Sequence, residues 1–282
     1  MSHNATGTAG LNDSAIGMRP VTEGELDVVH GDILYIEDLS VHFGTFRAIN
    51  ALNLYVRDLE LRCVIGPNGA GKTTLMDVIT GKTHRRNARI DGQVFLGQAL
   101  DALTHSEAQI AQAGVGRKFQ KPTVCEHLAV WENLELTQSG SRHWWHHWRA
   151  RLDAGQKARI QAVLEQIRLE DSAFRLAGEL SHGQKQRLEI GMLLMQQPRL
   201  LLLDEPAAGL SDEETAELAD LILGLRGQCA MLVIEHDMDF VARLAGETGL
   251  VSVLAEGALL AQGTLAQVRT DPRVMASYLG RG

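Results

Sequence analysis

Hydrophobic and polar residues follow different periods along the chain, and these periods predict its secondary structure. Alternation with a period of two predicts strands with one buried face over 33–43 and 48–56. Short, largely apolar runs predict strands over 59–65, 200–203, 230–235 and 249–255. A further strand is predicted over 89–96. Helical periodicity covers 72–80, 106–113 and most of 126–177. Apolar strands that alternate with helices are typical of a parallel sheet covered on both faces, so we expect an α/β fold.

The composition of the 282 residues is that of a globular protein, with 45% hydrophobic and 22% charged residues. A formal net charge of −8 argues against a general nucleic-acid-binding protein, because that affinity depends on neutralising phosphates. No apolar run approaches the ~18–20 residues that span a bilayer. Residues 1–31 are polar and lack the pattern of a secretory signal. We therefore expect a flexible polar tail over 1–31 and a cytoplasmic protein that does not cross a membrane by itself.

A glycine-rich segment lies between the strand predicted over 59–65 and the helix predicted over 72–80, and it satisfies the phosphate-loop pattern G-x-x-x-x-G-K-[ST]. Glycines let backbone N–H groups curl around phosphates, and the start of a helix adds a positive dipole end. Lys72 would reach the β- and γ-phosphates, and Thr73 would bind Mg²⁺. The predicted nucleotide-binding residues of this segment are Gly66, Pro67, Asn68, Gly69, Ala70, Gly71, Lys72, Thr73 and Thr74.

Two acidic residues end the buried strand predicted over 200–203. A carboxylate pair at the end of such a strand needs a partner, and Mg²⁺ with an attacking water supplies one. Asp204 is therefore the candidate Mg²⁺ ligand, and Glu205 is the candidate general base that polarises water for attack on the γ-phosphate. The alternative is that both acids cap the strand end or the next turn, with Pro206 as the breaker.

The segment LSHGQ at residues 180–184 lies between the phosphate loop and the acidic strand. It resembles the LSGGQ signature of ATP-binding cassette (ABC) ATPases, with His182 where glycine is usual. The resemblance implies that Ser181, Gly183 and Gln184, at a helix N-terminus that favours anions, meet the γ-phosphate of an ATP bound to the other subunit. Two chains would then enclose two ATP molecules. The alternative for Ser181 is a simple helix N-cap.

Other elements of the ABC family follow in the family's order. Phe43, before Gly44, matches the aromatic residue that stacks on adenine, and the alternative is a core strand residue. Gln120 resembles the glutamine that senses Mg²⁺ and the attacking water and that joins the helical insert to the core. His236 matches the histidine that touches the γ-phosphate, and the alternative is a surface histidine after a strand.

The resemblance therefore assigns catalytic roles to Glu205, His236 and Gln120, and Mg²⁺ binding to Thr73, Gln120 and Asp204. Residues 208–212 resemble the loop that crosses between subunits, although residue 211 is serine where many members have aspartate.

The resemblance covers residues from about 33 to 282 and implies a fold, cofactors and partners. The expected fold is one ABC ATPase domain over 32–282. It has a phosphate-loop NTPase core of mixed or parallel sheet flanked by helices, an antiparallel β subdomain, and an α-helical subdomain inserted at about 124–195. The expected cofactors are ATP and Mg²⁺. The expected partners are an identical or homologous second ATPase subunit, two integral membrane permease subunits and, indirectly, a solute-binding protein, but no nucleic acid. Such a subunit would be peripheral on the inner face of the cell membrane.

Two further resemblances concern the transported solute. Residues 208–210 and 277–280 resemble cytosolic subunits of branched-chain amino acid importers. Residues 116–123 and 180–194 resemble more narrowly the ATP-binding subunit of urea transporters, the UrtD type. The implied function is an ATP-hydrolysing importer subunit for urea or a short amide, with a branched-chain amino acid importer as the alternative. This solute assignment rests on resemblance alone, because an ATPase subunit does not touch the solute.

Three other functions compete with this interpretation. A non-transport ABC ATPase that acts on ribosomes or DNA usually has two cassettes or long coiled insertions, whereas this chain has one set of motifs. A phosphate-loop kinase or GTPase is disfavoured by LSHGQ and His236. A regulatory ATP sensor without hydrolysis conflicts with an intact Glu205.

The cysteines and a segment rich in histidine and tryptophan are weaker indicators of structure and function. The three cysteines, Cys63, Cys125 and Cys229, lie in or beside apolar stretches and are predicted to be reduced core residues. The segment 141–151 is rich in histidine and tryptophan, and its three histidines allow a metal site. The preferred interpretation is a helix that packs on the insert through its tryptophans.

Overall fold

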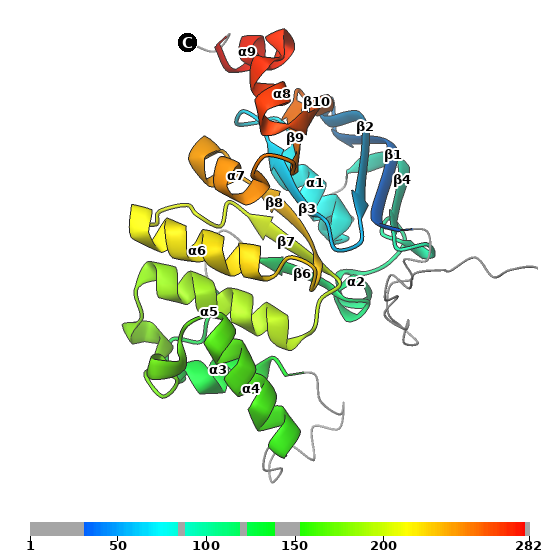
Figure 1. Cartoon of the computed structure of the whole chain (residues 1–282). Coiled ribbons are helices and arrows are strands. Elements are labelled where there is room, and N and C mark those ends of the chain that lie inside the picture. Colours follow the sequence, from blue (N-terminus) through cyan, green and yellow to red (C-terminus); the bar gives the residue numbers. More distant parts are fainter. Residues whose placement is uncertain (1–30, 84–87, 119–122, 139–152, 280–282) are drawn as a thin grey trace, which may run out of the picture.

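The computed structural model of the chain describes residues 31–83, 88–118, 123–138 and 153–279. These residues form a six-stranded sheet with helices, a four-stranded antiparallel sheet, and a helical part that Figure 1 shows at one end of the molecule. The segment 141–151 and Gln120 lie outside the described residues. No helix within the described ranges has the length and apolar composition needed to cross a membrane.

The six-stranded sheet places the chain's chemical motifs at one edge. Its spatial order is β10-β9-β3-β8-β7-β6, in which β9 to β6 are mutually parallel and β10 is antiparallel to β9. Because Val64 of β3 and Asp204 of β7 both pair with Ile234 of β8, the carboxyl ends of these three strands lie side by side. The strands are β3 (Leu61–Ile65), β6 (Val115–Lys118), β7 (Leu200–Asp204), β8 (Ala230–Ile234), β9 (Leu250–Ala255) and β10 (Ala258–Thr264).

Both faces of this sheet are covered by helices. Leu200 and Leu202 of β7 belong to one hydrophobic cluster, with α1 (Lys72–Ile79) and α2 (Glu107–Gln112). Leu201 and Leu203 belong to the other cluster, with α5 (His182–Met195), α6 (Asp212–Gly224) and α7 (Met238–Ala245). Because successive strand side chains point to opposite faces, both faces of β7 are buried. The prediction of a parallel sheet covered on both faces is confirmed.

The antiparallel sheet has the order β2-β1-β4-β5 and shares a hydrophobic cluster with α1. Its strands are β1 (Asp32–Phe43), β2 (Phe46–Arg57), β4 (Arg89–Leu96) and β5 (Leu100–Asp101). The hairpin of β1 and β2 is in register at Tyr35 and Tyr55, whose rings lie 5.0 Å apart. A backbone bond from Asn50 N–H to Gly257 O (2.9 Å) joins this sheet to the turn between β9 and β10.

The helical part comprises α3 (Val130–Leu136), α4 (Ala154–Gln166), α5, and 3-10 turns at η3 (Glu170–Ser172) and η4 (Ala177–Glu179). Figure 1 shows α5 beside α6. Helices α3 and α4 pack on α5, and α5 in turn contacts β6 of the large sheet. Gly191 of α5 allows close packing here, because a Cβ on it would lie 2.7 Å from Ile167 Cδ1. After β10 the chain continues into α8 (Leu265–Thr270) and α9 (Pro272–Leu279).

Some expectations differ from the structure. Strands β5, β6 and β10 were not expected. Strand β6 was missed because two of its four residues, Arg117 and Lys118, are charged, although Lys118 is fully buried. Strand β10 is an edge strand whose residues are only partly buried. The prediction that all three cysteines lie in the core is wrong for Cys125, which is exposed because it lies in the loop before α3, while Cys63 and Cys229 are buried.

Candidate nucleotide-binding site

The phosphate loop follows β3 and leads into α1. Gly71, the residue before α1, has φ +98°, and a Cβ there would lie 2.7 Å from the carbonyl oxygen of Ala48 on β2. The Lys72 ammonium donates to the carbonyl oxygens of Gly66 (2.6 Å) and Pro67 (3.2 Å), and the residue is 6% exposed. Burial lowers the pKa of Lys72, against the nearby carboxylates, which raise it. The loop therefore curls around a buried cation.

A pocket of about 370 Å³ opens over this loop. Glu205, the residue after β7, lines it as well, so the structure brings the two predicted halves of the site together. Phe43, the predicted adenine contact, packs against the hydrophobic core and is not among the residues that line the pocket. The aromatic residue that lines it is Phe46, which is 63% exposed. The other lining residues are Ala48, Asn68, Gly69, Ala70, Gly71, Lys72, Thr73 and Thr74.

Asp204 ends β7 as a buried carboxylate. Arg117 donates to Asp204 Oδ2 (3.2 Å) and to Asp77 Oδ1 of α1 (2.7 Å). Asp204 Oδ1 is buried and has no hydrogen-bond partner among the described residues. Burial raises the pKa of Asp204, although the Arg117 guanidinium lowers it. Arg117 was not predicted as a site residue, because nothing in the sequence says that its side chain crosses to two acids.

The residues at this edge fit Mg²⁺ bound together with a nucleotide. Mg²⁺ prefers oxygen ligands and is commonly held by one or two protein groups plus substrate phosphates. Asp204 Oδ1 offers one such oxygen, and Thr73 is among the residues that line the pocket. Within the described part of the chain, no group of three or more His, Cys, Asp and Glu side chains could hold a metal by itself.

Glu205 and His236 follow neighbouring strands and face each other. His236 Nδ1 lies 3.7 Å from Glu205 Oε1 and 3.8 Å from Glu235 Oε2. Glu205 has φ +48°, a left-handed conformation that is rare for residues other than glycine and that is often found at functional sites. Its N–H donates to the carbonyl oxygen of Ile234 (2.9 Å), which fixes the strand end.

Glu235 is a site residue that sequence reasoning placed only in a strand. It is 1% exposed, and its carboxylate accepts from the N–H groups of Ala207 (2.9 Å) and His236 (3.1 Å). Burial raises its pKa, against these hydrogen bonds. Glu235 thus ties the loop after Glu205 to the loop that carries His236.

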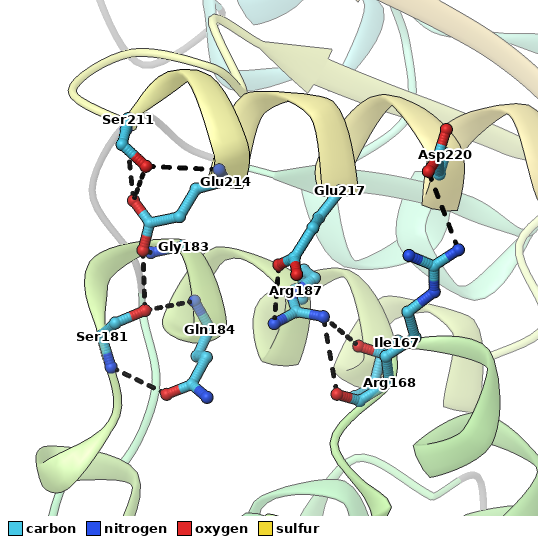
Figure 2. Close-up of polar contacts among 10 residues, drawn as sticks. All are labelled: Ile167, Arg168, Ser181, Gly183, Gln184, Arg187, Ser211, Glu214, Glu217 and Asp220. Carbon is cyan, nitrogen blue, oxygen red and sulfur yellow. Dashed lines mark hydrogen bonds and ion pairs between the residues drawn. The ribbon is translucent and has the colours of Figure 1, made fainter.

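The signature residues form the start of α5 and do not line the pocket. Ser181 Oγ accepts from Gln184 N–H (3.2 Å), and Gln184 Oε1 accepts from Ser181 N–H (3.0 Å), so the predicted N-cap is present as a capping box. Figure 2 shows that Ser181 Oγ and the Gly183 N–H face Glu214 of α6. The chain therefore carries two separate polar sites, one at the phosphate loop and one at the start of α5.

Comparisons with known proteins identify the class to which this arrangement belongs. The sequence model of the family described as ABC transporter matches residues 49–208, more than half of the chain. The chain belongs to this family and is an ABC-type ATPase, in which ATP hydrolysis is coupled to transport. A second model, described as branched-chain amino acid ATP-binding cassette transporter, matches residues 258–282. Within the family, the chain is of the branched-chain amino acid importer type.

Two relatives are similar over nearly their whole length. The high-affinity branched-chain amino acid transport ATP-binding protein BraF of Pseudomonas aeruginosa is 37% identical over 261 residues, which cover 88% of this chain and 98% of the relative. The corresponding protein LivG of Escherichia coli is 38% identical over 259 residues, with the same coverage.

Solved structures of ATP-binding cassettes have the same fold. A nucleotide-free ATP-binding cassette from an ABC transporter superposes with a TM-score of 0.74 at 29% identity, covering 88% of this chain and 99% of the other. The ADP conformation of an ATP-binding cassette gives a TM-score of 0.72 at 30% identity, with the same coverage. The predicted ABC ATPase fold, including the antiparallel sheet, is confirmed.

Proposed function

We propose that the chain is the ATP-hydrolysing subunit of an importer and that two cassettes close on two ATP molecules. The observation that carries this proposal is the separation of the two polar sites. Lys72 and Glu205 meet in one pocket, whereas Ser181 and Gly183 lie outside it. The start of α5 is a ready anion site. A signature that does not reach its own pocket can serve a nucleotide held by a second subunit.

Each residue of the pocket has a proposed role. Lys72 and the N–H groups of the loop hold the phosphates, while Thr73 and Asp204 hold Mg²⁺, which neutralises phosphate charge. Phe46 is the aromatic surface available to the adenine ring. Gln120 keeps the role that the family resemblance assigns to it.

Glu205 is the proposed general base, since it is the acidic residue that lines the pocket, directly after Asp204 at the end of β7. His236 lies beside it and is the proposed contact to the γ-phosphate.

Nucleotide preference tests this proposal against a GTPase or kinase. We expect the purified chain to hydrolyse ATP in the presence of Mg²⁺. When GTP is added in about tenfold excess as a competitor, ATP hydrolysis should remain largely unchanged. Hydrolysis is measured as released phosphate. Release of labelled phosphate from ATP when no phosphoryl acceptor other than water is present shows that the chain does not need a kinase substrate. A preference for GTP would defeat the proposal.

A membrane permease is the proposed partner on the helical part. Apolar side chains are exposed there: Phe174 is 84% exposed, Leu136 63% and Leu176 46%. The Phe174 ring stacks on Trp131 at 6.1 Å, which joins this surface to α3. Exposed apolar patches commonly mark interaction sites. The complex would hold two permease subunits and a second ATPase subunit, identical or homologous, on the inner face of the membrane, and it would receive solute from a solute-binding protein.

For the solute, we propose a branched-chain amino acid as the first candidate, because BraF and LivG support it. Urea or a short amide is the second candidate, supported by the resemblance of residues 116–123 and 180–194 to urea transporter subunits.

Uptake by cells distinguishes the two solutes. Deleting the gene for this chain is expected to abolish energy-dependent uptake of labelled leucine, and a plasmid copy should restore it, while a Lys72→Ala copy should not. Loss of labelled urea uptake with leucine uptake intact would replace the first candidate by the second.

A further inference from the structure

The anion site at the start of α5 is filled by a side chain of the same molecule. Glu214 of α6 reaches across to the signature, and its Oε1 accepts from Ser181 Oγ (2.7 Å) and from Gly183 N–H (3.1 Å). Its other carboxylate oxygen accepts from Ser211 N–H (3.2 Å) at the start of α6 (Figure 2). One carboxylate thus bridges the N-termini of two helices.

The carboxylate lies directly on the Gly183 backbone. A Cβ on Gly183 would lie 2.7 Å from Glu214 Cδ and 2.8 Å from Oε1, so only glycine leaves room for this contact. The hydrogen bond from Ser181, together with those from Ser211 and Gly183, lowers the pKa of Glu214, which is therefore an anion at neutral pH. The signature already holds a negative charge where a phosphate is expected to bind.

We infer that Glu214 is an internal competitor of the γ-phosphate. Its carboxylate must leave Ser181 and Gly183 before the signature can close on ATP held by a second subunit. The inference rests on the proposed function. The Gly183 N–H provides one proton, and Glu214 occupies the space above it, so a carboxylate and a phosphate cannot both bind there. Two anions at one site also repel each other. The contact therefore opposes premature closure of the dimer.

Another contact between α5 and α6 provides a matched control. One turn further along both helices, Arg187 of α5 pairs with Glu217 of α6 at 3.2 Å (Figure 2). Glu217→Gln removes a carboxylate from the same helix and breaks a contact to the same partner helix, but it leaves the signature donors untouched. It separates competition for the anion site from simple weakening of the α5–α6 contact.

The experiment measures the ATP concentration at which the full chain dimerises. The background is Glu205→Gln, so that closed dimers are not lost by hydrolysis, and sedimentation velocity reports the dimer fraction. Glu214→Gln keeps the shape of the side chain and removes its charge, while Glu214→Asp keeps the charge near the helix start but withdraws it from Ser181. Both variants are expected to lower the half-saturating ATP concentration about three- to tenfold, and Glu217→Gln is expected to leave it unchanged.

Failure of the inference about Glu214 and failure of the proposed function give different results. An unchanged or higher ATP requirement in both Glu214 variants would overturn the inference, because it would mean that Glu214 merely positions the signature or plays no part. An equal decrease in Glu217→Gln would also overturn it. Failure of the Glu205→Gln background itself to dimerise with ATP would instead reject the proposed function and the inference with it. Thermal unfolding of every variant confirms that each one is folded.

Discussion

Glu205→Gln is expected to lower ATP turnover by about 10²- to 10⁴-fold, the usual contribution of a general base, while leaving ATP binding intact. Glu205 lines the pocket next to the phosphate loop, and its unusual backbone conformation is fixed by the bond to Ile234. Glutamine keeps the size of the side chain and its place beside His236, but it cannot take a proton from water. Phosphate release under single-turnover conditions measures the loss, and a fluorescent nucleotide measures binding.

Glu213→Gln is the matched control for this experiment. Glu213 is an exposed acid in the first turn of α6, away from the pocket lining, and its replacement makes the same change of charge. Turnover in this variant should equal that of the unmodified chain. If the Glu205 variant also hydrolyses ATP normally, Glu205 is not the base.

Lys72→Ala is expected to weaken ATP binding by about 100-fold, which corresponds to ~2.7 kcal/mol. The ammonium is buried within the loop, where burial lowers its pKa. Its hydrogen-bond acceptors among the described residues are the carbonyl oxygens of Gly66 and Pro67. Phosphate oxygens would offer this desolvated cation anionic partners, and charge-assisted hydrogen bonds are about twice as strong as neutral ones.

Titration with labelled ATP measures this change, and Lys157→Ala on the exposed side of α4 controls for the loss of one positive charge. Near-normal ATP affinity in the Lys72 variant, with its fold intact, would show that the loop is not the phosphate site.

The sequence predicted the parts of the site that are local in the chain. The phosphate loop and the pair of Asp204 and Glu205 are continuous segments, and each lies at the end of a strand whose apolar run is plain. Because parallel strands place their carboxyl ends at one edge, the meeting of these segments also followed from the fold class.

The parts that were missed depend on contacts between distant residues. Arg117 lies 87 positions from Asp204, and Ser181 lies 33 positions from Glu214, so neither contact has a local pattern. Phe43 and Phe46 flank one hairpin turn, and only the fold shows which ring faces the pocket. The solute is harder still, since the resemblance to ABC ATPases implies that this subunit does not touch it. Two local resemblances suggested urea, whereas similarity over 88% of the chain favours branched-chain amino acids.

Closure of two cassettes on ATP should be visible as a doubled mass of the Glu205→Gln chain in solution. Sedimentation equilibrium with saturating ATP and Mg²⁺ is expected to give twice the mass of one chain, and the mass should return to that of a single chain in ADP. If the mass stays that of a single chain while every chain is shown to carry bound ATP, ATP binding does not bring two cassettes together.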